Sequence, residues 1–147
     1  MYLVDTNIVS QSDPRKSARA RELIKWMDTA SPYLFLSAVT ASEVMAGISK
    51  ANRTGATTRA AALTEWWEQI EALYGDRILV YDIAVARAAG AMFDRSRAFN
   101  PGFADIAIGA TAKVHGLTVL TANEAHFIPL GVAFINPLKD LPPLPGA

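Results

Sequence analysis

Residues 103–123 read FADIAIGATAKVHGLTVLTAN and contain a complete helix-to-strand unit. Residues 103–116 predict a helix that Gly116 ends, and the apolar run that follows at residues 117–121 predicts a strand. Apolar strands that alternate with helices are typical of a parallel sheet that helices cover on both faces. This stretch therefore indicates an α/β fold.

The same alternation extends outward along the rest of the chain. Strands are predicted at residues 2–5, 31–37, 77–82 and 132–136, and helices at residues 16–30, 38–52, 57–75, 83–98 and 123–127. We expect one domain over residues 1–147, with a three-layer α/β/α architecture and an extended, proline-rich tail at residues 138–147.

Composition narrows the class of protein. Of the 147 residues, 51% are hydrophobic, so a globular chain is expected. The 14 basic residues balance the 14 acidic residues, so the net charge gives no indication either way of a nucleic-acid or membrane partner. The chain has no cysteine, which excludes disulfides and thiolate metal ligands. No apolar run approaches the roughly 18 residues of a membrane span, and no signal peptide is recognisable. A soluble, cytoplasmic protein is expected.

Polar side chains occur at the places where this fold puts its functional crevice, beyond the carboxyl ends of the parallel strands. Asp5 ends the first strand, Glu43 lies in the helix after the second, and Asp105 lies at the start of the helix before the fourth. Asn123 follows the fourth strand. The four positions define a candidate site.

Each of these residues also has a purely structural interpretation. Asp5 and Asn7 could form a turn or a cap with their side chains, and Asn123 could cap a helix. Asp105 could be a first-turn acid that the helix dipole stabilises. The sequence TASE over residues 40–43 matches a capping box in which Glu43 bonds back to Thr40.

The neighbours of the acids favour a site. Asp105 shares a helix face with Ile108 and Gly109, and Glu43 aligns with Gly47, so both acids are expected beside closely packed surface. With no Lys or Arg beside them in sequence, a cation is the natural means of neutralising them. Oxygen ligands without cysteine or a histidine cluster favour Mg²⁺ or Mn²⁺ over Zn²⁺, and such ions are common in phosphate-ester hydrolysis.

Four segments together resemble the PIN domain, and most closely the VapC/FitB-type toxins of toxin–antitoxin systems. They are LVDTN at residues 3–7, SAVTASEVMAGI at residues 37–48, residues 103–123, and HF with INP at residues 126–127 and 135–137. The resemblance covers nearly the whole chain. It implies a five-stranded parallel sheet, Mg²⁺-dependent endoribonuclease activity on RNA, 5′-phosphate and 3′-hydroxyl products, and inhibition by a cognate antitoxin. It also implies a homodimer and a larger toxin–antitoxin complex that binds operator DNA through the antitoxin.

The resemblance also implies residue roles. The acidic positions of the family fall on Asp5, Glu43 and Asp105, while the fourth falls on Asn123, where the family more often has Asp. Asp5 and Asp105 would hold the ion, and Glu43 would orient or deprotonate the attacking water. With one charge fewer, a single ion is expected in the absence of RNA. The helpers that would position metal-bound water or a phosphate oxygen beside Asn123 are Thr6 and Thr121.

Local basic segments offer contacts to RNA phosphates, although each could equally form a solvated surface. The candidates are Arg15, Lys16, Arg19, Arg21, Arg95 and Arg97. For His126 a structural role is favoured, and the stripe formed by Trp67, Ile70 and Tyr74 is read as core or interface. Asp82 is expected to cap a helix, and a place at the edge of the candidate site is the second interpretation.

Two alternative functions compete with a nuclease. An aspartyl-phosphate hydrolase also places Asp after an apolar first strand, but it needs a second acid where this chain has Asn7 and a lysine near the later acids, where only Lys113 is available. The other alternative is a catalytically weak subunit that acts mainly in an antitoxin–DNA regulatory complex, with Asn123 as the mark of decayed catalysis.

Overall fold

The computed structural model describes residues 1–16 and 20–146. Five parallel strands form one sheet in the order β3-β2-β1-β4-β5. The strands are β1 (Tyr2–Val4), β2 (Leu34–Ser37), β3 (Ile78–Leu79), β4 (Thr118–Leu120) and β5 (Phe134–Ile135). The α/β fold with a five-stranded parallel sheet is therefore confirmed.

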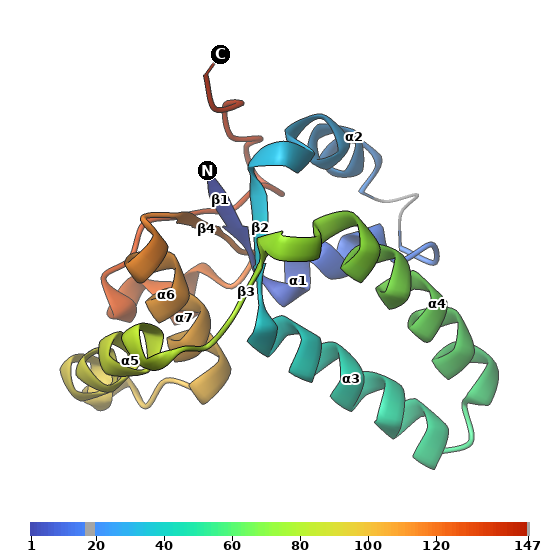
Figure 1. Cartoon of the computed structure of the whole chain (residues 1–147), viewed down its shortest axis with the longest axis horizontal. Helices are drawn as coiled ribbons and strands as arrows, with labels where there is room; N and C mark the ends of the chain where they lie inside the picture. Colours follow the sequence, from blue (N-terminus) through green and yellow to red (C-terminus); the bar gives the residue numbers. More distant parts are fainter. Residues whose placement is uncertain (17–19, 147) are drawn as a thin grey trace.

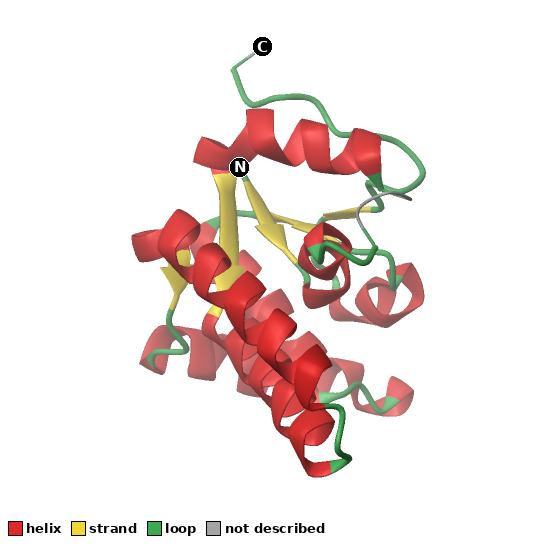
Figure 2. Ribbon diagram, turned by 90° about the vertical axis from the view of Figure 1, so that its right-hand side faces the viewer, coloured by secondary structure: helices red, strands yellow, loops and turns green. Residues whose placement is uncertain are grey.

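Helices cover both faces of the sheet (Figure 1). They are α1 (Thr6–Val9), α2 (Arg21–Ala30), α3 (Ala38–Arg53), α4 (Thr57–Tyr74), α5 (Ile83–Ser96), α6 (Phe103–His115) and α7 (Glu124–Phe127). Short 3₁₀ turns lie between these elements, at Ser10–Ser12, Ser31–Tyr33, Gly75–Arg77, Arg97–Phe99 and Ile128–Leu130. Figure 2 shows the sheet enclosed between helices, with the hairpin of α3 and α4 extending away from it.

The strand side chains alternate between two hydrophobic cores. Tyr2 and Val4 face the core that helices α1 to α4 complete, whereas Leu3 faces the core that α5 and α6 complete. This period of two is the expected consequence of a pleated strand with helices on each side. The predicted stripe of α4 lies in the first core, where Trp67 and Tyr74 are buried, so the core interpretation is confirmed.

Several predicted element boundaries were wrong. The strand predicted at residues 77–82 spans only Ile78–Leu79, and the next two residues, Val80 and Tyr81, are exposed. The strand predicted at residues 31–37 begins only at Leu34, because Pro32 lies in a 3₁₀ turn. Helix α1 and the 3₁₀ turn after it lie in a region for which no helix was predicted.

The proline-rich tail lies against the rest of the molecule. The hydroxyl of Tyr2 donates a hydrogen bond to the Pro143 carbonyl at 2.6 Å, and Leu144 packs against the first core. None of the helices in the described ranges has the length and apolarity needed to cross a membrane.

Candidate active site

The parallel sheet brings the ends of β1 and β4 together. The backbone N–H of Asp5 donates to the Leu120 carbonyl at 2.9 Å, so the first residues after these two strands are neighbours. Asp5 lies at the N-cap of α1, and Thr121 lies directly after β4. This register places a hydroxyl beside the carboxylate.

Asp5 is buried, with 3% of its surface exposed, and three donors hold its carboxylate. Oδ1 accepts from the Thr6 backbone N–H at 2.8 Å. Oδ2 accepts from the Asn7 amide and from the Thr121 hydroxyl, each at 2.7 Å. The orientation of Asp5 is thus fixed by its own chain segment and by the neighbouring strand.

The electrostatic environment raises the pKa of Asp5 above its ordinary value of 3.8. Burial is the main cause, because it disfavours the charged carboxylate. Hydrogen bonds from Thr121 and Thr6 oppose that effect, while the negative charges of Asp105 and Glu43 add to it. Asp5 therefore interacts electrostatically with both of the other predicted acids.

Glu43 is an exposed residue of α3 that a contact from α1 orients. The Thr6 hydroxyl donates to its Oε1 at 2.6 Å, and the hydroxyl oxygens of Thr6 and Thr40 are 3.1 Å apart. The capping-box interpretation was wrong: Ser37 is the N-cap of α3, and its hydroxyl accepts from the Val39 N–H at 3.1 Å. Glu43 therefore does not cap its own helix and instead contacts Thr6, the residue that follows Asp5.

The helix faces beside the two acids differ. On α6, Ile108 and Gly109 are buried as predicted, and a Cβ at Gly109 would lie 3.2 Å from Sδ of Met92. On α3 the expectation was wrong, because Gly47 is exposed and a Cβ there would meet no atom within 4 Å. Only Asp105 extends from a closely packed face.

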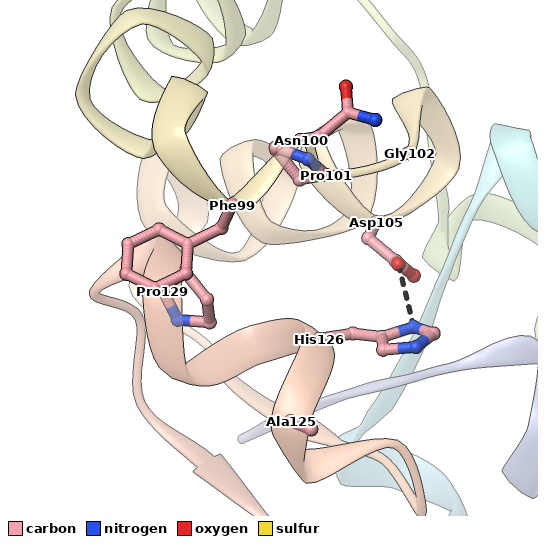
Figure 3. A pocket seen from close by; sticks show the side chains of 8 residues that line it. All are labelled: Phe99, Asn100, Pro101, Gly102, Asp105, Ala125, His126 and Pro129. Carbon is pink, nitrogen blue, oxygen red and sulfur yellow. Dashed lines mark ion pairs between the residues drawn. The ribbon is translucent and has the colours of Figure 1, made fainter.

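Asp105 lies in the first turn of α6, and its side chain is 22% exposed. Its Oδ2 lies 3.0 Å from Nδ1 of His126, which α7 supplies (Figure 3). The sequence favoured a structural role for His126, and the contact between His126 and Asp105 was not predicted. The signal in the sequence was its position three residues after Asn123.

Asn123 follows β4 and is exposed. It occupies the N-cap position of α7, but its side chain makes no capping hydrogen bond, and its backbone N–H donates to the Thr121 hydroxyl at 3.0 Å. Asn7 was not predicted as a site residue. Its Oδ1 accepts from the Ala122 N–H at 3.0 Å while its amide donates to Asp5, so it joins the ends of β1 and β4. An Asp-x-Asn sequence after a strand was the only signal for this role.

The chemistry of the donors suits a divalent cation. Within residues 1–16 and 20–146, no Lys or Arg forms an ion pair with Asp5, Glu43 or Asp105, and their mutual repulsion contributes to the raised pKa of Asp5. The same described residues contain no group of three His, Asp or Glu side chains close enough to hold an ion together. A single ion shared by all three acids would therefore need water molecules between it and at least one of them, an arrangement that suits Mg²⁺ because Mg²⁺ usually keeps several of its waters.

None of the basic candidates that the structure describes forms an ion pair with the three acids. Arg15 makes a bidentate contact with the buried Asp13, and its closest approach is 2.7 Å. Lys16 and Arg21 are exposed, and Arg19 lies outside the described residues. Arg95 and Arg97 are exposed at the end of α5 and in the 3₁₀ turn after it. Their roles in binding RNA stay predictions. Asp82 caps α5 as predicted, since its Oδ1 accepts from the Val85 N–H at 2.9 Å.

The protein is thus an α/β protein with a parallel sheet and a cluster of acids beyond the carboxyl ends of its strands. In this cluster Asp5 is buried, Asp105 is half-buried and Glu43 is exposed. Residues 2–128 match the PIN domain, and the chain belongs to the PIN domain family.

Two relatives cover almost the whole chain. One is the toxin FitB of Neisseria gonorrhoeae, which is 31% identical over 144 residues, with coverage of 95% of this chain and all of the relative. The other is the VapC ribonuclease Y4jK of Sinorhizobium fredii, which is 30% identical over 140 residues, covering 93% of this chain and 97% of the relative.

Solved structures share the fold. The crystal structure of FitAcB from Neisseria gonorrhoeae superposes with a TM-score of 0.80 at 31% identity, covering 94% of this chain and 99% of that chain. The structure of FitAB bound to an IR36 DNA fragment superposes with a TM-score of 0.74 at 28% identity, covering 93% and 95% of the two chains.

Proposed function

We propose that this protein is a metal-dependent endoribonuclease toxin of a toxin–antitoxin system, using Mg²⁺ or Mn²⁺ to hydrolyse phosphodiester bonds in RNA. The observation that carries the proposal is the environment of Asp5. A buried carboxylate is held by three hydrogen bonds and repelled by two further acids, and no described Lys or Arg is paired with any of the three. The similarity to the VapC ribonuclease Y4jK supports the ribonuclease activity.

The chain's own residues divide the work of the site. Asp5 and Asp105 would hold the cation, directly or through one water, and Thr121 and Asn7 keep the Asp5 carboxylate in place. When bound, the cation polarises a phosphate oxygen and lowers the pKa of water. Glu43 is available to orient the attacking water or accept its proton, because only one of its oxygens is engaged by Thr6.

Asn123 changes the charge of the centre rather than its shape. It can offer a carbonyl oxygen to metal-bound water or to a phosphate oxygen, but it contributes no negative charge. Three ionised carboxylates are sufficient to neutralise one divalent cation, whereas two cations would leave a net positive charge until the RNA phosphates arrive. We therefore expect one ion in the RNA-free protein, and two tight sites in a metal titration would contradict this.

A cognate antitoxin is the expected protein partner. The FitAB structure contains a DNA fragment, so a larger antitoxin complex on operator DNA is part of the proposal. A homodimer and a cytoplasmic location are also proposed, on the family resemblance alone. The alternative of a catalytically weak subunit rests on Asn123, the exposed amide at the usual acidic position. A phosphohydrolase is disfavoured, since Asn7 binds Asp5 as a donor and, within the described ranges, Lys113 pairs with none of the acids.

The test is cleavage of labelled RNA by the purified protein in Mg²⁺ and in EDTA. Chelator-sensitive cutting that Asp105→Asn abolishes, in a variant with an unchanged circular dichroism spectrum, supports the nuclease. Asp76→Asn is the matched control, because Asp76 is exposed before β3, at the opposite end of the sheet, and should retain full activity. No cutting at any Mg²⁺ or Mn²⁺ concentration favours the regulatory subunit, and undiminished cutting by Asp105→Asn refutes the assigned site.

A further inference from the structure

A pocket opens directly beside the acidic centre and shares Asp105 with it. Its volume is about 380 Å³, at the small end of the range for ligand pockets. The walls come from the segment between α5 and α6 and from the segment around α7. Figure 3 shows Phe99 and Pro129 on one side and the pair formed by Asp105 and His126 on the other. Apart from Asp105, the residues that line this pocket have no part in the proposed cleavage of RNA.

Phe99 is the most exposed phenylalanine among the residues that the structure describes. It is 68% exposed, although it lies on a pocket wall. The next residue, Asn100, lines the same pocket and is the one non-glycine residue with a positive φ, 47°, within the described ranges. A left-handed conformation of this kind is uncommon outside glycine, although Asn tolerates it better than most residues. The backbone here turns sharply immediately after the ring.

The surroundings of Phe99 suit a nucleic acid. Arg95 and Arg97 precede the ring in the segment RSRAF, and both are exposed. Within the described ranges, Arg97 pairs with one acid, Asp94, at 3.7 Å, and both side chains are largely open to solvent. Its guanidinium also donates to the Asp94 backbone carbonyl at 2.8 Å. Exposed aromatic rings alternating with cations are the usual means of binding single-stranded nucleic acid, because bases stack on the rings and phosphates contact the cations.

We propose that this pocket receives one unpaired RNA base, stacked on Phe99, from the nucleotide next to the phosphate that the acidic centre cleaves. The assignment rests on the proposed nuclease function. Asp105 is common to both places, so a phosphodiester held at the centre has its neighbouring nucleotide at the mouth of the pocket. The small volume suits a single planar ring system better than a protein segment. The enzyme would then prefer unpaired RNA, since a base in a duplex cannot enter.

The test measures binding separately from cleavage. An Asp105→Asn background prevents cutting, and a fluorescein-labelled single-stranded 12-nucleotide RNA reports affinity by anisotropy in Mg²⁺. Replacing Phe99 by Ala in that background should weaken binding about tenfold, the effect expected from the loss of one stacked base. Phe99→Trp should restore it. Phe93→Ala is the matched control, because Phe93 is an exposed phenylalanine of α5 that does not line the pocket, and it should leave affinity unchanged.

A second probe reports the base itself. The same RNA carrying 2-aminopurine at successive positions should show quenching at one position on binding, and the quenching should disappear with Phe99→Ala. If the wild-type protein cuts RNA but Phe99→Ala changes neither affinity nor fluorescence, the base site is wrong while the nuclease function stands. If Phe99→Ala instead converts a dimer to a monomer in light scattering at unchanged RNA affinity, the ring belongs to an interface between copies and the proposal is overturned. A wild-type protein that neither binds nor cuts RNA refutes both.

Discussion

Replacing Thr121 by valine removes one hydroxyl at the buried end of β4 while conserving the size of the side chain. That hydroxyl donates to Oδ2 of Asp5 at 2.7 Å, and both residues are buried. It also accepts from the backbone N–H of the exposed Asn123 at 3.0 Å, so the substitution removes that weaker, neutral hydrogen bond as well. Hydrogen bonds to charged groups contribute roughly 1.5–3 kcal/mol, so we expect Thr121→Val to lower the free energy of unfolding by about 2 kcal/mol at pH 7. For a chain of 147 residues this is a fall in Tm of about 4–8 °C.

The matched control is Thr111→Val. Thr111 is equally buried, but its hydroxyl donates to the neutral Ala107 carbonyl at 2.7 Å. A neutral hydrogen bond contributes about 1 kcal/mol, so this variant should lose roughly half as much. Urea denaturation of both variants and the wild type, without metal, measures the difference.

The pH dependence gives the sharper test. Because the pKa of Asp5 is raised in the folded state, protonation of Asp5 favours folding: its contribution is most favourable below the ordinary value of 3.8 and is lost as pH rises through the folded pKa. Removing the Thr121 hydroxyl raises this pKa further, so the penalty of Thr121→Val should grow from pH 4 to pH 7. That of Thr111→Val should stay constant. Equal losses for the two variants at pH 7, or a Thr121→Val penalty that does not change with pH, would refute the reasoning.

Three further predictions concern other parts of the structure. Thr6→Val should reduce kcat for RNA about 10–100-fold, because it removes the 2.6 Å hydrogen bond to Glu43, the proposed general base, whereas Thr6→Ser should retain activity. Similar rates for the two variants would exclude this role for Thr6. Mg²⁺ at ten times its Kd should stabilise the wild type by about 1.4 kcal/mol, or about 3–6 °C in Tm, and should leave the Tm of Asp5→Asn unchanged. Equal Tm shifts of the two proteins in thermal scans would contradict a metal at Asp5. Gly109→Val should lower the free energy of unfolding by about 1–3 kcal/mol, because even a Cβ at this position would lie 3.2 Å from Sδ of Met92. Gly47→Ala, whose Cβ would meet no atom within 4 Å, should instead raise it by about 0.5–1 kcal/mol. Urea denaturation measures both changes, and the reverse order would contradict the packing.

The layered fold could be predicted because it depends on local patterns. Strands covered on both faces must be apolar throughout, and the run at residues 117–121 has that character. The ends of elements were less predictable. Val80 and Tyr81 continue an apolar run beyond β3, but they lie past the end of an edge strand, where burial no longer accompanies hydrophobicity.

The location of the acids could be predicted from topology, but their contacts could not. Ser37 and Thr40 both match a helix-capping pattern, and only the point where β2 ends decides that Ser37 caps α3. The bond from Thr6 to Glu43 joins residues 37 positions apart. The contact between His126 and Asp105 depends on how α7 packs against α6, which periodicity does not encode.

The central claim is that carboxylates from separate elements share one divalent cation. Anomalous diffraction from crystals of the wild-type protein soaked in Mn²⁺ measures this directly. A single strong peak within direct or one-water reach of both Asp5 and Asp105, and absent in crystals of Asp5→Asn, is the predicted result. No peak at the carboxyl edge of the sheet, or a peak bound by only one of these acids, would contradict the account.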